Sequence, residues 1–362
     1  MPRSITVLSR PPERRYGYSD DGTRKRDDKR ARGYIRLRAA TTSLHQPMIQ
    51  GSILGLVFSK DRALQLEACI TSFARHVEDA ASVNLVVVYG ASSDRFLRQY
   101  EALARRYDGT ARFLPEGRFR PRVLELLRSA GRSPSPARRP VLLDRLRRSV
   151  REPAPAPDEA ADFVLFLVDD TLFVRRLRLE LAMAALQANP DALGFSLRLG
   201  RNIIRSYVLE RQQELPRFWK VGEGILKYDW TQADGDFGYP LEVSSSLYRF
   251  TDVLRLVTGL SFRDPNTLES QMALRAPHFS RSQPSMLCSY TSVAFSAPVN
   301  RVQVVYENRA GANPVWSTES LADKFDHGLR IDVAALDGYV PSACHEEVEL
   351  PFERSRAQNS VE

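Results

Sequence analysis

Two adjacent aspartates, Asp169 and Asp170, stand directly after Phe163–Val168, the run that looks most deeply buried in the sequence. Carboxylates held side by side at the end of a rigid strand suit a divalent cation, which takes oxygen ligands and can also bridge phosphate oxygens. The pattern predicts a site for a metal ion and a diphosphate. The alternative is that one aspartate caps the next turn and the other faces water.

Polar side chains also follow two earlier apolar runs, at Ser59–Arg62 and at Gly90–Ser93. In open α/β sheets ligands bind beyond the carboxyl ends of the strands, so we expect these residues to gather with the aspartates at one edge. No GxGxxG and no GxxxxGK[ST] sequence follows any of these runs. Dinucleotide-binding and P-loop enzymes are therefore not indicated.

The elements that must position these residues alternate between strands and helices. Strands are predicted at Ile53–Phe58, Asn84–Tyr89, Phe163–Val168 and Leu193–Leu197, with Phe113-Leu114 as a further candidate. Between them, apolar residues recur at the three- to four-residue spacing of a buried helix face. Because the strands are apolar on both sides, helices must cover both faces of the sheet. The sequence predicts an α/β, Rossmann-like fold with a mostly parallel, doubly wound sheet.

Three stretches resemble glycosyltransferases of the GT-A fold, in particular the bacterial, family-two-like enzymes that use nucleotide sugars. GLVFSKDRALQLEACITSF is similar to their first strand and helix, FLVDDTLF to the strand that ends in their aspartate-rich metal motif, and VSSSLYRFTDVLRLVTGLSFRDPNTLES to their acceptor-side stretch. The resemblance spans about residues 52 to 350. It implies a GT-A fold, Mn²⁺ or Mg²⁺ as cofactor, and transfer of a sugar from a nucleotide-diphosphate donor to an acceptor hydroxyl.

The resemblance also implies roles for single residues. Asp169 would hold the ribose or a metal-bound water, Asp170 would hold the metal, and Glu269 would take the place of the catalytic base. His345, in ACHEEVEL, matches a late histidine that completes the metal site in such enzymes.

The sequence departs from the family pattern in three respects. The aspartates are adjacent rather than separated by one residue, the acidic pair of the base appears as Thr267-Leu268-Glu269, and a Gly-Gly acceptor loop is absent. The donor nucleotide, the sugar, the acceptor and the choice between inversion and retention therefore stay open.

Sugar transfer requires that charge on the departing diphosphate be neutralised, which a metal at Asp170 would do as a Lewis acid, with Arg62 or Arg201 assisting. An inverting enzyme also needs a carboxylate to accept the proton of the acceptor hydroxyl, and Glu269 and Asp236 are the candidates. A retaining enzyme needs no such base.

The remaining candidates concern binding. Ser59 and Asp61 join Arg62, Asp169 and Arg201 as donor-binding residues. Trp230 and Tyr239 belong to a segment rich in aromatic, acidic and glycine residues, and we assign them to the acceptor.

Each candidate has a structural alternative. Glu269 lies three residues after Asn266, so it also fits the N3 position of a capping box. Asp61 would serve as a plain helix cap, Trp230 and Tyr239 as core residues, and His345 as a histidine satisfied by protein partners.

The net charge of +8 on 362 residues is confined to two segments. Residues 1–47 hold 12 Lys and Arg against 5 Asp and Glu, and residues 116–160 hold 11 Arg against 6 Asp and Glu. The remaining body is mildly acidic, so a basic groove through it is not indicated and nucleic acid is not the expected partner.

These segments set the expected domains. Residues 1–47 are interpreted as a disordered basic arm, or as untranslated sequence if synthesis begins at Met48. Residues 48–352 would form the GT-A domain, interrupted at 116–160 by a basic, Pro-rich insertion, and 353–362 a tail. The amphipathic stretch Val141–Val150 would pack on its own domain or touch a membrane surface or an acidic partner.

Composition excludes several classes. Three scattered cysteines argue against a disulfide framework, and no apolar run approaches the length of a membrane span. We therefore expect a cytoplasmic enzyme that acts on a glycan or glycoconjugate, with the assembly of surface glycans as its expected setting. A phosphatase of the haloacid dehalogenase type would need aspartates two residues apart, whereas Asp169 and Asp170 are adjacent. The non-enzymatic alternative is a nucleic-acid or partner-binding protein that acts through its basic segments.

Overall fold

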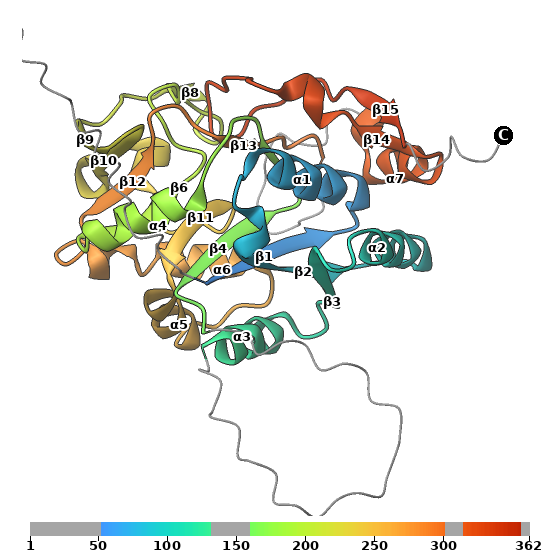
Figure 1. Ribbon diagram of the computed structural model, residues 1–362, viewed down its shortest axis with the longest axis horizontal. Helices are drawn as coiled ribbons and strands as arrows, with labels where there is room; N and C mark the ends of the chain where they lie inside the picture. Colours follow the sequence, from blue (N-terminus) through green and yellow to red (C-terminus); the bar gives the residue numbers. More distant parts are fainter. Residues whose placement is uncertain (1–51, 132–159, 301–313, 356–362) are drawn as a thin grey trace, which may run out of the picture. The chain divides into compact units, whose positions relative to one another are not determined.

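The computed structural model describes residues 52–131, 160–300 and 314–355 of the chain (Figure 1). At its centre lies a nine-stranded sheet in the order β3-β2-β1-β4-β11-β6-β12-β10-β9. The first four of these strands run parallel to one another. Their bounds are β1 Ile53–Lys60, β2 Val83–Gly90, β3 Ala111–Pro115 and β4 Phe163–Val168.

The second half of the sheet is mixed. Strand β11 (Ser245–Arg249) is antiparallel to both β4 and β6 (Ala192–Ser196), and β12 (Ser285–Ser289) is parallel to β6. The hairpin of β9 (Phe218–Gly222) and β10 (Ile225–Asp229) forms the far edge. The alternation of strand and helix does not indicate β11, because its run Ser245–Arg249 reads as the polar lead into a helix.

Helices cover both faces of the sheet, because each central strand is buried on both sides. Ile53 and Val57 of β1 pack with α1 (Ala63–His76), α2 (Asp94–Arg106), α4 (Leu179–Ala188) and α7 (Thr318–Asp326). Leu54 and Leu56 face the opposite layer, formed by α3 (Phe119–Ala130), α5 (Phe250–Thr258) and α6 (Pro265–Ala273). The predicted α/β fold, with a large and mostly parallel sheet flanked by helices, is confirmed.

Short ladders bring the C-terminal segment to the end of β4. Strand β5 (Thr171–Phe173) pairs with β13 (Ala294–Ser296), and Ser296 forms a further bridge with His345. Two further pairings lie at the periphery: β7 (Arg205–Ser206) pairs with β8 (Arg211–Gln212), and β14 (Leu329–Ile331) pairs with β15 (Phe352–Arg354).

The peripheral segments are described only in part. Residues 1–47 and the amphipathic stretch Val141–Val150 lie outside the described residues. The first part of the segment 116–160, which the sequence indicates is an insertion, forms helix α3. Val123 and Leu127 of this helix are fully buried in the core. The sequence alone favours an insertion here because arginines surround these apolar residues. Within the described ranges, no helix is long and apolar enough to cross a membrane.

Candidate active site

A cavity of about 340 Å³ opens at the carboxyl ends of β1, β2 and β4. This is the edge at which the sequence predicts ligand binding. The start of α6 and the segment Val243-Ser244 also line it, and the Ser244 carbonyl accepts a hydrogen bond from Thr171 Oγ1 beside Asp170. Most of the residues that line it carry polar or charged groups: Ser59, Lys60, Arg62, Glu116, Asp169, Asp170, Ser244, Asp264, Asn266, Glu269, Asn300 and His345.

The two aspartates share one arginine. Arg62 Nη1 donates to Asp169 Oδ1 at 3.0 Å and lies 3.4 Å from Asp170 Oδ2, while Nη2 donates to the backbone carbonyl of Asn300. Burial raises the pKa of Asp169 to about 6, an effect that the Arg62 guanidinium opposes. When both carboxylates are ionised, the cluster keeps one negative charge in excess, which favours a cation at this point.

The loop between β1 and α1 is fixed by its own side chains. Asp61 adopts a left-handed backbone conformation, with φ of 54°, and its carboxylate accepts a hydrogen bond of 2.7 Å from the backbone N–H of Ser92. Asp61 therefore ties the loop to the end of β2 instead of capping α1. Ser59 Oγ lies 2.6 Å from the Tyr100 hydroxyl, which also accepts from the backbone N–H of Arg62.

Glu269 belongs to α6 and lines the same cavity as Asp170. Its Oε2 accepts from the backbone N–H of Val243 at 3.0 Å, and its Oε1 accepts from the Tyr239 hydroxyl at 3.4 Å. Burial raises the pKa of Glu269, and the nearby Glu242 carboxylate adds to the effect. A carboxylate with a raised pKa is suited to accept a proton near neutral pH.

The capping box of α6 involves other residues than Glu269. Asp264 is the N-cap, its Oδ1 accepts from the backbone N–H of Thr267, and the Thr267 hydroxyl accepts in return from the backbone N–H of Asp264. The structure therefore removes the capping alternative for Glu269, which lies two residues further along the helix.

His345 borders the cavity, but its Nε2 is engaged by Arg198 at 3.0 Å. A guanidinium can only donate, so Nε2 accepts with its lone pair and the proton of the neutral ring resides on Nδ1. Burial, together with the Arg198 charge, lowers the pKa of His345 to about 3. In this arrangement neither ring nitrogen offers a lone pair to a metal, which does not support the predicted metal contact.

Arg198 also forms a buried ion pair with Glu242 at 3.1 Å. Glu242 in turn accepts from the backbone N–H groups of Ser244 and Ser245 and from the Ser246 hydroxyl. Arg198 thus links the His345 side of the cavity to the segment that carries Val243 and Ser244.

The other side chains of the cavity supply a metal ion with only part of its ligands. Within residues 52–131, 160–300 and 314–355, no group of three or more His, Cys, Asp or Glu side chains is arranged to hold one. Asp170 and the oxygens of a bound diphosphate fit Mn²⁺ or Mg²⁺, because Mg²⁺ commonly takes one or two carboxylates together with substrate phosphates.

Arg201, Trp230 and Asp236 lie outside this cavity, and neither Asp61 nor Tyr239 is among the residues that line it. Arg201 stacks over the rings of Phe218 and Tyr290, and Trp230 is a core residue whose Nε1 donates to the backbone carbonyl of Gln283. Asp236 accepts hydrogen bonds from Ser206 and Gln213. The sequence places these residues near the site only because they are adjacent in the chain to segments that do reach it.

Tyr239 has an intermediate position. It is 41% exposed and reaches the cavity through Glu269, so its ring stays a candidate for the acceptor.

Sequence analysis missed several residues of this cavity, among them Lys60, Glu116 and Asn300. Lys60 carries a usable signal, because it follows the first strand directly. Glu116 was assigned to the insertion, and Asn300 has no signal of its own because it is brought to Arg62 by the chain path after β13.

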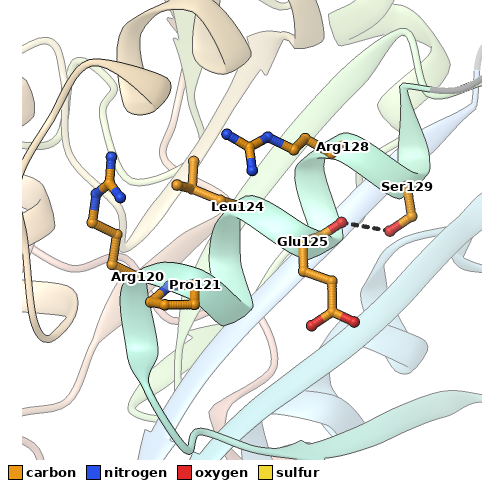
Figure 2. Close-up of a pocket in the computed structure, with 6 residues that line it drawn as sticks. All are labelled: Arg120, Pro121, Leu124, Glu125, Arg128 and Ser129. Carbon is orange, nitrogen blue, oxygen red and sulfur yellow. Dashed lines mark hydrogen bonds between the residues drawn. The ribbon is translucent and has the colours of Figure 1, made fainter.

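A second hollow, of about 600 Å³, lies along the outer side of α3 (Figure 2). All six of its lining residues belong to that one helix, with Arg120, Leu124 and Arg128 on one side of the view. Arg120 donates to the backbone carbonyls of Leu260 and Thr258 and so connects α3 to the end of α5. No second element adds a reactive group there, and the candidate site remains the cavity beside Asp170.

No protein-family model matches this sequence. The chain is 22% identical over 300 residues to the bifunctional glycosyltransferase pgtA of Dictyostelium discoideum, which covers 76% of this chain and 35% of that protein. The chain therefore spans about a third of the length of this curated relative.

Two solved structures align with part of this chain. TarS of S. aureus matches 68% of this chain and 36% of its own, with 12% identity and a TM-score of 0.42. The mannosyltransferase PcManGT of Pyrobaculum calidifontis, in complex with GDP-Man and Mn²⁺, matches 80% of this chain and 65% of its own, with 14% identity and a TM-score of 0.39. At the level of sequence, most of this chain is thus similar to part of a glycosyltransferase.

Proposed function

We propose that this protein is a glycosyltransferase that moves a sugar from a nucleotide-diphosphate donor to an acceptor hydroxyl of a glycan or glycoconjugate. The observation that carries the proposal is one cavity lined both by the Arg62–Asp169–Asp170 cluster and by Glu269, whose pKa is raised. The similarity to a curated glycosyltransferase over 76% of the chain supports it.

Each side chain has a distinct task in this proposal. A Mn²⁺ or Mg²⁺ at Asp170 would supply Lewis-acid stabilisation of the diphosphate. Arg62 orients both aspartates. Glu269 accepts the proton of the acceptor hydroxyl, held in place by the backbone N–H of Val243.

The test is calorimetric titration with UDP, GDP, CDP and dTDP, each with and without Mn²⁺. The wild-type protein is compared with Asp170→Asn, which keeps the side-chain shape and removes the charge. Asp108→Asn is the matched control, because Asp108 is exposed and outside the cavity.

The proposal predicts Mn²⁺-dependent binding of at least one diphosphate, lost in Asp170→Asn and retained in Asp108→Asn. Folded wild-type protein that binds none of the four nucleotides would refute it. Binding that is equally strong without Mn²⁺ and in Asp170→Asn would refute the metal dependence.

A further inference from the structure

Glu116 is a carboxylate in the cavity that the proposed chemistry does not use. It is partly buried, and no hydrogen bond or ion pair of its side chain is found within the described ranges of the chain. Burial raises the pKa of Glu116, with Lys60 opposing the effect and Asp264 adding to it. Its carboxylate oxygens are therefore free to accept hydrogen bonds from water or from a ligand.

The strand register places Glu116 at a defined distance from Asp170. Phe58 of β1 is level with Val168 of β4 and with Val88 of β2, and Val88 is level with Leu114 of β3. Asp170 and Glu116 each follow this common level by two residues.

The two carboxylates are therefore separated mainly across the sheet. The backbones of β3 and β4 are three strand spacings apart, or about 14 Å, and the Glu116 carboxylate lies over the end of β2, two spacings or about 10 Å from β4. This range is the scale of an extended nucleoside diphosphate measured from its terminal phosphate to its base, whereas its ribose lies closer to the phosphates.

The surroundings of Glu116 also suit a base. Phe58, Val88 and Phe119 give this end of the cavity an apolar wall, while Lys60 adds a cationic donor. The carboxylate lies over the end of β2, where a Cβ on Gly90 would come within 2.9 Å of Glu116 Oε2. The neighbouring Asp264 is already engaged in the cap of α6.

A carboxylate only accepts hydrogen bonds, and two oxygens accept best from two N–H groups that lie side by side. Among the common bases, guanine presents such a pair, its ring N1–H and its 2-amino group, next to a carbonyl oxygen that Lys60 can reach. Uracil presents a single N–H between two carbonyl oxygens, one of which would face a carboxylate oxygen.

We propose that Glu116, assisted by Lys60, reads the base of the donor and makes this enzyme specific for guanine nucleotides. This inference rests on the proposed function, because it presumes that the diphosphate lies at the Arg62–Asp169–Asp170 cluster. It assigns a GDP-sugar as the donor class.

The test is calorimetric titration with GDP, IDP and UDP in the presence of Mn²⁺. IDP differs from GDP only by the missing 2-amino group. We expect GDP to bind about tenfold or more tightly than IDP, the effect of one hydrogen bond to a charged group, and more tightly than UDP. In Glu116→Gln the advantage of GDP over IDP should largely disappear.

The matched control is Glu125→Gln on the exposed side of α3, which should bind all three nucleotides as the wild type does. Thermal melting of Glu116→Gln checks that it is folded. Tighter binding of UDP than of GDP would overturn the inference and leave the proposed function intact. An equal loss for all three nucleotides in Glu116→Gln would place Glu116 on the ribose and also overturn it. Absence of binding by any nucleotide would refute the proposed function and the inference with it.

Discussion

Whether an acidic side chain of this protein can act in the cavity depends on its immediate neighbours as well as on its residue type. Glu269 and Asp236 are both partly buried acids whose pKa is raised by burial. Asp236 is satisfied by Ser206 and Gln213 away from the cavity, whereas Glu269 lines it and is steadied by one backbone N–H. Of these two acids, only Glu269 is placed to act as the proposed general base.

Glu269→Gln should lower kcat by about 10²- to 10⁴-fold, because it removes the proton acceptor while the donor site stays intact. The Kd for the nucleotide should not change. Since the base acts when ionised and its pKa lies above the ordinary value of 4.5, wild-type activity should fall as the pH drops through that raised pKa. Steady-state rates from pH 5 to 8 measure this.

The part of the acid limb that Glu269 causes should be missing from the residual activity of Glu269→Gln, whereas protonation of Asp169, whose pKa is about 6, should still lower the activity of the variant. If the variant retains full kcat, Glu269 is not the base. A wild-type acid limb that persists unchanged in the variant would assign the titration to another group.

At the scale of elements, α6 matters because it carries Glu269 to the cavity. The helix is nine residues long, too short to be stable by itself, so its start depends on the Asp264–Thr267 capping box. Leu268 and Met272 fix the other side of the helix in the core. The direction of Glu269 thus follows from a cap and two core contacts.

Thr267→Ala should destabilise the protein by about 0.5–2 kcal/mol, because it leaves the backbone N–H of Asp264 without its acceptor. The kcat should also fall as Glu269 loses its fixed position, while the nucleotide Kd stays unchanged. Urea unfolding and steady-state kinetics measure the two effects. Thr258→Ala, at the exposed end of α5, is the control and should change neither. A Thr267→Ala protein as stable as the wild type would contradict the role of the cap.

At the scale of the whole molecule, the Arg198–Glu242–His345 network connects segments that are far apart in the sequence. Arg198 is separated from Glu242 by 44 residues and from His345 by 147. Each partner lies in or beside a wall of the cavity, so the network holds the end of the chain against the central sheet. Both charges of the Arg198–Glu242 ion pair are almost fully buried. Removing one charge alone should therefore change the free energy of unfolding strongly, because the other charge stays buried without its partner.

Arg198→Met should destabilise the protein by about 3–5 kcal/mol, because it leaves the Glu242 carboxylate buried without its partner. Arg198→Met combined with Glu242→Gln should recover a substantial part of that loss. Arg128→Met, an exposed arginine on α3, is the control and should change stability little. Urea unfolding of the four proteins gives the comparison. A double variant less stable than Arg198→Met would show that the pair is not coupled as the structure indicates.

Local sequence determined the first half of the fold. The runs at Ile53–Phe58, Asn84–Tyr89 and Phe163–Val168 are apolar on both faces, and such runs form buried parallel strands whatever lies beyond them. For the same reason the sequence places a candidate site at the end of β4, where the structure brings Asp169, Asp170 and Arg62 together.

Only the tertiary structure decided which distant residues join that site. Glu116 lies among arginines in the sequence and therefore carries no sign of a site residue. Asn300 reaches Arg62 through the path of the chain after β13. The Nε2 atom of His345 accepts from Arg198 and is not available to a metal. Trp230 and Arg201 lie elsewhere because an aromatic or basic residue serves equally well in a core or at a surface. Periodicity reports the local environment of a strand or helix, whereas a side chain's partners depend on long-range packing that one sequence does not display.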